Sequence, residues 1–131
     1  MKLKRTGLIL LILSFSFMAM SCAMFQKAET DPLVSITTSY QVLGTSITSL
    51  HQIAINLRSS GKINDAQMVQ YNTIFFKVQS AYIAAGTTLS MVITTSDTVK
   101  KKEYMTAFES IAGNISGLIT ELNTFLSGVN K

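Results

Sequence analysis

The sequence predicts an all-α fold, an elongated antiparallel three-helix bundle that runs up, down and up over residues 32–131. Apolar residues recur at spacings of three and four along three stretches of similar length, which is the period of an amphipathic α-helix. Turns of only a few residues separate these stretches, so that consecutive helices must be antiparallel neighbours. We find no alternating strand pattern, no repeat signature and no low-complexity linker. The chain is therefore expected to hold one elongated helical domain.

Residues 1–21 have the pattern of a secretion signal. A basic start, Met1 to Arg5, precedes an apolar stretch from Gly7 to Met20, an apolar run of about a dozen residues that Ser14 and Ser16 interrupt. A helix needs about 20 apolar residues to cross a bilayer stably. The stretch is shorter than that and fits the apolar region of a cleaved signal.

Ala19-Met20-Ser21-Cys22 resembles the lipobox of bacterial lipoproteins, with alanine where leucine is commonest in that family. The resemblance implies cleavage between Ser21 and Cys22, a diacylglyceryl group on the Cys22 thiol and, usually, an acylated amino terminus. Cys22 is the single cysteine of the chain, so it has no intramolecular disulfide partner. Two alternatives are ordinary signal cleavage after Ser21, which would leave a free thiol, and an uncleaved membrane anchor.

An acylated Cys22 would hold the protein on a membrane. Stable anchoring requires more than one acyl chain, at ~0.8 kcal/mol for each buried CH₂ group. Residues 22–31 would then be a lipid-anchored tether. Ala23 is not the acidic residue that the family uses for inner-membrane retention. The resemblance therefore implies the cell envelope, and the outer membrane in a Gram-negative cell.

The net charge of +4 is largely a property of the signal segment. Three of the eleven basic residues lie there, which leaves eight against seven acidic residues, or +1, for the rest of the 131-residue chain. We therefore expect no nucleic-acid partner. Lys100-Lys101-Lys102 is the one run of charge, and it fits a solvated turn into a helix better than a phosphate or lipid-headgroup site.

The first helix is expected from about Pro32 to Ser59. Asp31 can accept hydrogen bonds from the first free N–H groups, and proline suits the first turn. Ile53 and Ile55 are expected to widen the apolar stripe near its end, and Gly61 is a plausible left-handed cap. The stripe consists of Ile36, Tyr40, Leu43, Ile47, Leu50, Ala54 and Leu57.

The second helix is expected from about Asp65 to Thr94. Asn64 and Gln67 have the spacing of a capping box, and Ile63 and Met68 that of a hydrophobic staple. The β-branched run 92–95 also suits a strand, but the helical period before it favours a helix. The stripe consists of Tyr71, Ile74, Val78, Ala81, Ala85, Leu89 and Val92, flanked by Phe75 and Tyr82.

The third helix is expected from about Val99 to Leu126, with Ser127-Gly128 as its end. Gly113 and Gly117 have GxxxG spacing, which outside membranes more often indicates tight packing within a bundle. The stripe consists of Met105, Phe108, Ala112, Ile115, Ile119, Leu122 and Leu126.

The outward positions carry mainly Ser, Thr, Asn and Gln. No Asp, Glu, Lys or Arg occurs from Pro32 to Leu57, and Lys77 is the one charge between Asp65 and Asp97. Bundle surfaces usually carry many charges. Either these faces are weakly charged and solvated, or a second copy or another protein covers some of them.

The residues needed for chemistry are sparse. His51 is the only histidine and fits a boundary position better than a base or ligand. No metalloprotease, paired-cysteine, phosphate-loop or EF-hand motif is present in the sequence. Met68, Met91 and Met105 fit the core or its edge better than a copper site. We therefore expect no catalytic residue, no metal site and no cofactor.

The aromatic residues of the second helix are too many for one stripe, so one or two should be exposed. Phe75, Phe76 and Tyr82 are the candidate contact residues. We expect a membrane-anchored, non-catalytic interaction or structural module that binds an envelope or phage protein, or a second copy. The alternative is a self-assembling or membrane-perturbing, toxin-like helical protein. In length and uncharged faces the chain resembles small helical lipoproteins of phages and prophages, some of which block superinfection at the envelope.

Overall fold

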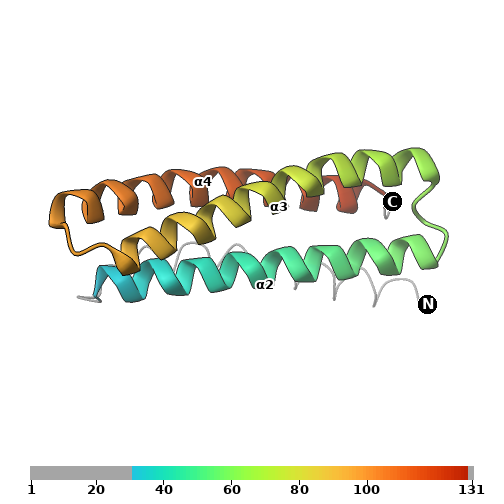
Figure 1. Ribbon diagram of the computed structural model, residues 1–131. Helices are drawn as coiled ribbons and strands as arrows, with labels where there is room; N and C mark the ends of the chain where they lie inside the picture. Colours follow the sequence, from blue (N-terminus) through green and yellow to red (C-terminus); the bar gives the residue numbers. More distant parts are fainter. Residues whose placement is uncertain (1–30, 130–131) are drawn as a thin grey trace. The chain divides into compact units, whose positions relative to one another are not determined.

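The computed structural model describes residues 31–129, which form three α-helices and, within that range, no strand. Helix α2 spans Pro32–Ser59, α3 spans Asp65–Thr94 and α4 spans Thr98–Val129. The helices run up, down and up, and each packs along the other two (Figure 1). The expected all-α three-helix bundle is confirmed.

Local sequence fixes both ends of α2. The Asp31 carboxylate accepts a hydrogen bond from the Leu33 N–H at 2.9 Å, and Pro32 occupies the first turn. At the other end Gly61 has φ 72° and its N–H donates to the Arg58 carbonyl at 3.0 Å. The Lys62 N–H donates to the Leu57 carbonyl at 2.9 Å. Together these two bonds form a Schellman cap, in which glycine adopts the left-handed conformation without strain.

The predicted capping box begins α3. The Asn64 side chain accepts from the Gln67 N–H at 2.9 Å, and the Gln67 side chain accepts from the Asn64 N–H at 3.0 Å. Ile63 is 1% exposed and Met68 packs against the core, as the hydrophobic staple requires. The turn between α2 and α3 is thus specified by its own residues.

Helix α4 is longer than its sequence pattern predicts. It begins at Thr98, where the Asp97 carboxylate accepts from the N–H groups of Val99 and Lys100 at 2.9 and 3.1 Å. The prediction that Ser127-Gly128 ends the helix is wrong, because α4 continues to Val129. Leu126 is 3% exposed and Val129 packs against the core, so tertiary contacts hold the last turn in helical form.

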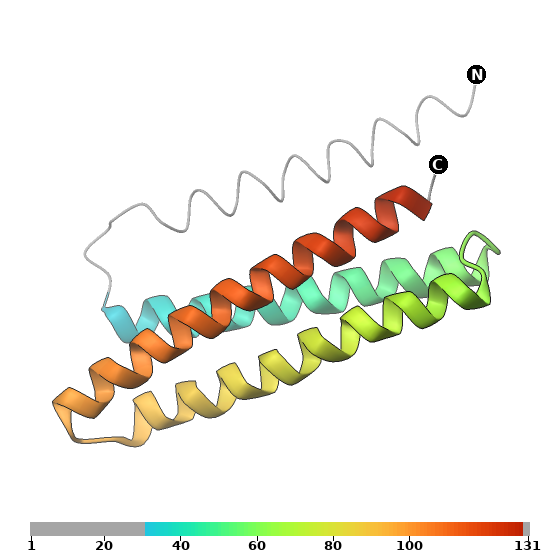
Figure 2. The ribbon, with the colours of Figure 1, turned by 90° about the horizontal axis from the view of Figure 1, so that it is seen from above.

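The three helices run alongside one another through the length of the bundle (Figure 2). The core lies between them, and α3 and α4 share the most extensive contact. Each predicted stripe supplies residues to it, and the rest of each stripe packs around its edge. The prediction that Ile53 and Ile55 widen the stripe of α2 is wrong, since they are 42% and 41% exposed. The buried hydrophobic residues are Ile36, Leu43, Ile47, Leu50, Ala54, Ile63, Tyr71, Phe75, Val78, Ala85, Leu89, Val92, Phe108, Ile115, Leu122 and Leu126.

Two tyrosines and two glycines join α2 to α3. The rings of Tyr40 and Tyr82 stack with centroids 4.3 Å apart and planes 2° apart, and the Tyr82 hydroxyl donates to the Tyr40 carbonyl at 3.3 Å. Each ring end lies over a glycine of the opposite helix: Tyr82 over Gly44 and Tyr40 over Gly86. The stacked rings therefore occupy space that two Cβ atoms would otherwise take.

The other glycine pair is not packed. A Cβ on Gly113 or on Gly117 would meet nothing within 4 Å, and both residues are exposed. The prediction that their GxxxG spacing reflects tight packing within the bundle is wrong, because neither glycine lies in close contact with another helix.

Candidate contact face on helix α3

The predicted site residues divide between two regions of the chain. Ser21 and Cys22 lie outside the described residues. Phe75 is 8% exposed and belongs to the core, so its ring is not available as a surface contact. Tyr82 is half-buried and engaged with Tyr40. Phe76, by contrast, is 63% exposed and remains a contact candidate.

Phe75 is held inside by an aromatic cluster with His51 and Tyr71. Its ring stacks on His51 with centroids 4.5 Å apart and on Tyr71 with centroids 5.4 Å apart. Nδ1 of His51 and the hydroxyl of Tyr71 lie 3.0 Å apart and share a hydrogen bond whose donor depends on the imidazole tautomer. Burial raises the pKa of Tyr71 to about 12. The cluster joins α2 to α3 through these contacts. His51 is partly buried, at the boundary position expected for it.

A row of large apolar side chains lies on the outer side of α3. Val69, Phe76 and Ile83 are 66%, 63% and 69% exposed. They are seven residues apart, so they lie on one face, because seven residues make almost two turns. The core residues Tyr71, Val78 and Ala85 lie on the opposite side of the same helix. We call the row and the exposed small residue four positions after each of its members the α3 contact face: Val69, Thr73, Phe76, Ser80, Ile83 and Thr87.

The hydroxyl groups on this face are partly satisfied by their own helix. Thr73 donates to the Val69 carbonyl at 2.9 Å, and Thr87 donates to the Ile83 carbonyl at 3.1 Å. Such bonds four residues back occupy the hydroxyl donor. Methyl groups and apolar side chains therefore make up much of the face, and its polarity is lower than its composition suggests.

The same bond recurs on all three helices and accounts for many of the Ser and Thr residues at outward positions. Eleven Ser or Thr hydroxyls between residues 31 and 129 donate to the carbonyl four residues earlier. Each is a local bond that requires no partner element. The helices can therefore carry uncharged outer faces without leaving these hydroxyl donors unpaired.

A groove between α3 and α4 continues the α3 contact face. Val69 and Thr73 belong to both, and Gly117 of α4 contributes open space because it has no side chain. Lys77 and Glu121 add one charge of each sign to the lining. The groove is shallow and open, so it suits a side chain of a docked protein better than an enclosed small molecule.

Within residues 31–129 no three His, Cys, Asp or Glu side chains gather in a way that could hold a metal ion. An ion pair joins Arg58 to Asp65 across the turn between α2 and α3. None of the described helices is both long and apolar enough to cross a membrane.

Comparisons with known proteins add no relative: no family model, no curated protein and no solved structure matches this chain. The interpretation of the site therefore depends on its own residues.

Two members of the apolar row, Val69 and Ile83, were not among the predicted contact residues. The signal was present in the sequence as three large apolar residues seven apart, out of phase with the core stripe of the same helix. The prediction included aromatic residues only. Single exposed aliphatic residues are common on protein surfaces, so Val69 and Ile83 indicate a contact face only when they are considered together with Phe76.

Proposed function

We propose that this protein is a lipid-anchored bacterial envelope protein that acts through protein–protein contact and not through catalysis. In this proposal the signal is removed between Ser21 and Cys22, acyl chains on Cys22 enter the membrane, and the bundle presents the α3 contact face to a partner. The partner is a protein of the envelope or of a phage.

The observation that carries the contact function is the apolar row Val69, Phe76 and Ile83. Single exposed aliphatic residues are common on protein surfaces, but a regular row of them on one helix face is the pattern of a helix that packs against another protein. Lys77 is the one charge on α3 between Asp65 and the end of the helix. A partner could therefore cover the face without desolvating a row of charges.

Site-specific photo-crosslinking in membranes tests this function. A photoreactive phenylalanine analogue at position 76 should give a crosslinked product that is lost when Ile83→Ser is added. The same analogue at position 53, where Ile53 is a 42% exposed apolar residue of α2, is the matched control and should give none. Products from position 53 alone would contradict the α3 contact face.

The same row supports a second candidate, a self-assembling protein. Identical helices with apolar residues seven apart can pair with each other. A product from position 76 whose mass equals two copies of the chain would favour self-assembly, and a product with a different protein would favour the interaction module.

The membrane-perturbing form of this alternative has its own test. Protein that opens onto a bilayer should release dye from lipid vesicles, whereas a contact module on a lipid anchor should release none. Dye release that persists in Phe76→Ser would show that the α3 contact face is not needed to perturb the membrane, and would attribute the effect to the bundle as a whole.

A further inference from the structure

The end of the bundle where the tether joins it has its own surface chemistry. The start of α2, the end of α3 and the start of α4 lie together there (Figure 1). Each helix has an exposed aliphatic residue within three residues of this end: Val34 is 54% exposed, Ile93 is 55% exposed and Val99 is 67% exposed. The exposed apolar residues at this end thus come from all three helices.

Lys100, Lys101 and Lys102 follow Val99 in the first turns of α4. Successive residues are about 100° apart around a helix, so the three side chains fan out around its start. Among residues 31–129 none of them pairs with a carboxylate. Three cations at the positive end of the helix dipole also oppose helix stability. Their position is therefore not explained by the stability of α4.

Three carboxylates lie near the lysines. Asp31 and Asp97 accept hydrogen bonds from the first N–H groups of α2 and α4, and these short side chains stay against the helix ends. Glu103 is exposed on the next turn. Lysine side chains are longer and can extend their ammonium groups beyond the aspartates. The lysines can therefore carry positive charge beyond the two capping aspartates at this end.

The length of the tether limits how far this end can move from a lipid on Cys22. Asp31 follows Cys22 by nine residues, which span at most about 32 Å when fully extended. The helices are 28 to 32 residues long, or about 42–48 Å at 1.5 Å per residue. A lipid on Cys22 would thus keep the end with Asp31 near the bilayer.

We propose that this end rests on the surface of the bilayer that holds the lipid anchor. We call the six residues Val34, Ile93, Val99, Lys100, Lys101 and Lys102 the tether-end surface. The aliphatic side chains enter the boundary between headgroups and acyl chains, and the lysines lie at the phosphates of anionic lipids. This inference rests on the proposed lipid anchor.

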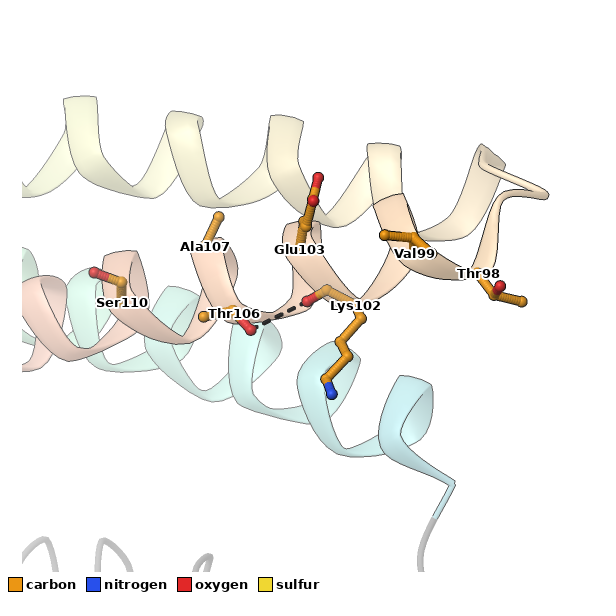
Figure 3. A pocket seen from close by; sticks show the side chains of 7 residues that line it. All are labelled: Thr98, Val99, Lys102, Glu103, Thr106, Ala107 and Ser110. Atoms are coloured by element: carbon orange, nitrogen blue, oxygen red, sulfur yellow. Dashed lines mark hydrogen bonds between the residues drawn. The ribbon is translucent and has the colours of Figure 1, made fainter.

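A shallow hollow on α4 continues the tether-end surface along the helix. It indicates which side of the bundle faces the lipid. Figure 3 shows Val99, Lys102 and Ala107 among the side chains that line it, all from α4. Much of its lining is aliphatic, from Val99 and Ala107 and from the methyl and methylene groups between them. Lysine can cover such a surface with its apolar stem while its ammonium group stays at the headgroups. Contact through this side brings Val99 and Lys102 to the bilayer together, with the Glu103 carboxylate beside them.

Environment-sensitive dyes on the lipidated full-length protein test the proposal. The lipid blocks the Cys22 thiol, so a dye can be placed on Val99→Cys alone. Val69→Cys is a closely matched control, since Val69 is 66% exposed, Val99 is 67% exposed, and Val69 lies near the other end of the bundle. In vesicles with phosphatidylglycerol, the dye at position 99 should shift to the blue and the dye at position 69 should not.

Neutralising the lysines distinguishes their contribution to membrane contact from the attachment that the acyl chains provide. K100Q/K101Q/K102Q should lower the equilibrium constant for contact with anionic vesicles by about fivefold for each lysine, from about 1 kcal/mol each. Added salt should have the same effect in the unsubstituted protein, by screening. The protein should remain on the vesicles in both cases, because acyl chains hold it.

The outcomes distinguish the two proposals. Protein that carries acyl mass and floats with vesicles, but shows no shift at position 99 or equal shifts at both positions, overturns the tether-end contact and leaves the lipid anchor standing. Protein that carries no acyl mass overturns the lipid anchor and the tether-end contact with it.

Discussion

A Cβ atom on Gly86 of α3 would lie 2.6 Å from the hydroxyl oxygen of Tyr40 on α2. The reverse holds 42 residues earlier, where a Cβ on Gly44 would collide with the hydroxyl of Tyr82 and lie 3.0 Å from its Cζ. The stacked tyrosines therefore depend on two glycines at these positions. On both α2 and α3 the glycine follows the tyrosine by four residues: Gly44 follows Tyr40, and Gly86 follows Tyr82.

Replacing either of these glycines by alanine should destabilise the bundle. Overpacking in a close contact costs about 1–3 kcal/mol, whereas the gain in helix propensity is at most about 1 kcal/mol. We therefore expect Gly44→Ala and Gly86→Ala to lower the free energy of unfolding, measured by urea denaturation. Adding Tyr82→Phe to Gly44→Ala should recover part of the loss, because it removes the colliding hydroxyl.

Gly113→Ala and Gly117→Ala are the matched controls for that experiment. A Cβ at either position meets nothing within 4 Å. These two changes should raise the free energy of unfolding by up to about 1 kcal/mol each. Equal effects of all four substitutions would contradict the tyrosine–glycine contact.

Phe75 and Phe76 are adjacent in the chain but should respond very differently to truncation. Phe75 is 8% exposed and Phe76 is 63% exposed. Phe75→Ala should cost about 3–5 kcal/mol of unfolding free energy, because it leaves a cavity among His51, Tyr71 and the core. Phe76→Ala should change it by no more than about 0.5 kcal/mol. The comparison uses denaturant unfolding of both variants, and a large loss from Phe76→Ala would show that its ring is buried.

Stability should fall in alkaline solution as Tyr71 ionises. Burial raises the pKa of Tyr71 from 10.0 to about 12, so the folded state holds the phenolic proton more tightly than the unfolded state. The stabilising contribution is therefore complete below pH 10 and is lost as the pH rises through about 12.

The unfolding free energy of the unsubstituted protein and of Tyr71→Phe, followed between these pH values, measures this effect. The phenylalanine variant should lose less stability over this pH range. It should still lose some, because burial and the contact with Tyr40 raise the pKa of Tyr82 to about 12 as well. A parallel decline in the two proteins would contradict the assignment to Tyr71.

The helices were predictable because their signals are local. Asp31 with Pro32, the capping box of Asn64 with Gln67, and Gly61 each fix a helix end through bonds within a few residues, and the apolar period fixes the faces. The end of α4 was not predictable, because a buried Leu126 and packed Val129 outweigh the breaking tendency of Gly128.

The choice between Phe75 and its neighbours also depends on tertiary contacts. Tyr71, Phe75 and Val78 fit the helical spacing as well as Tyr71, Ile74 and Val78 do. The structure places Phe75 inside because His51 on α2 stacks on its ring. Gly44 and Gly86 could not be separated from Gly113 and Gly117 for the same reason: the partner that occupies the missing side-chain space lies on another helix.

The most direct test of the central proposal, a lipid anchor on Cys22, is the intact mass of the protein from the membrane fraction, measured beside Cys22→Ala. The proposal predicts a mature species that begins at Cys22 and carries added acyl mass, with the alanine variant lacking that mass and the membrane association. An unmodified species with a free Cys22 thiol would contradict the proposal and would move the self-assembling alternative ahead of it.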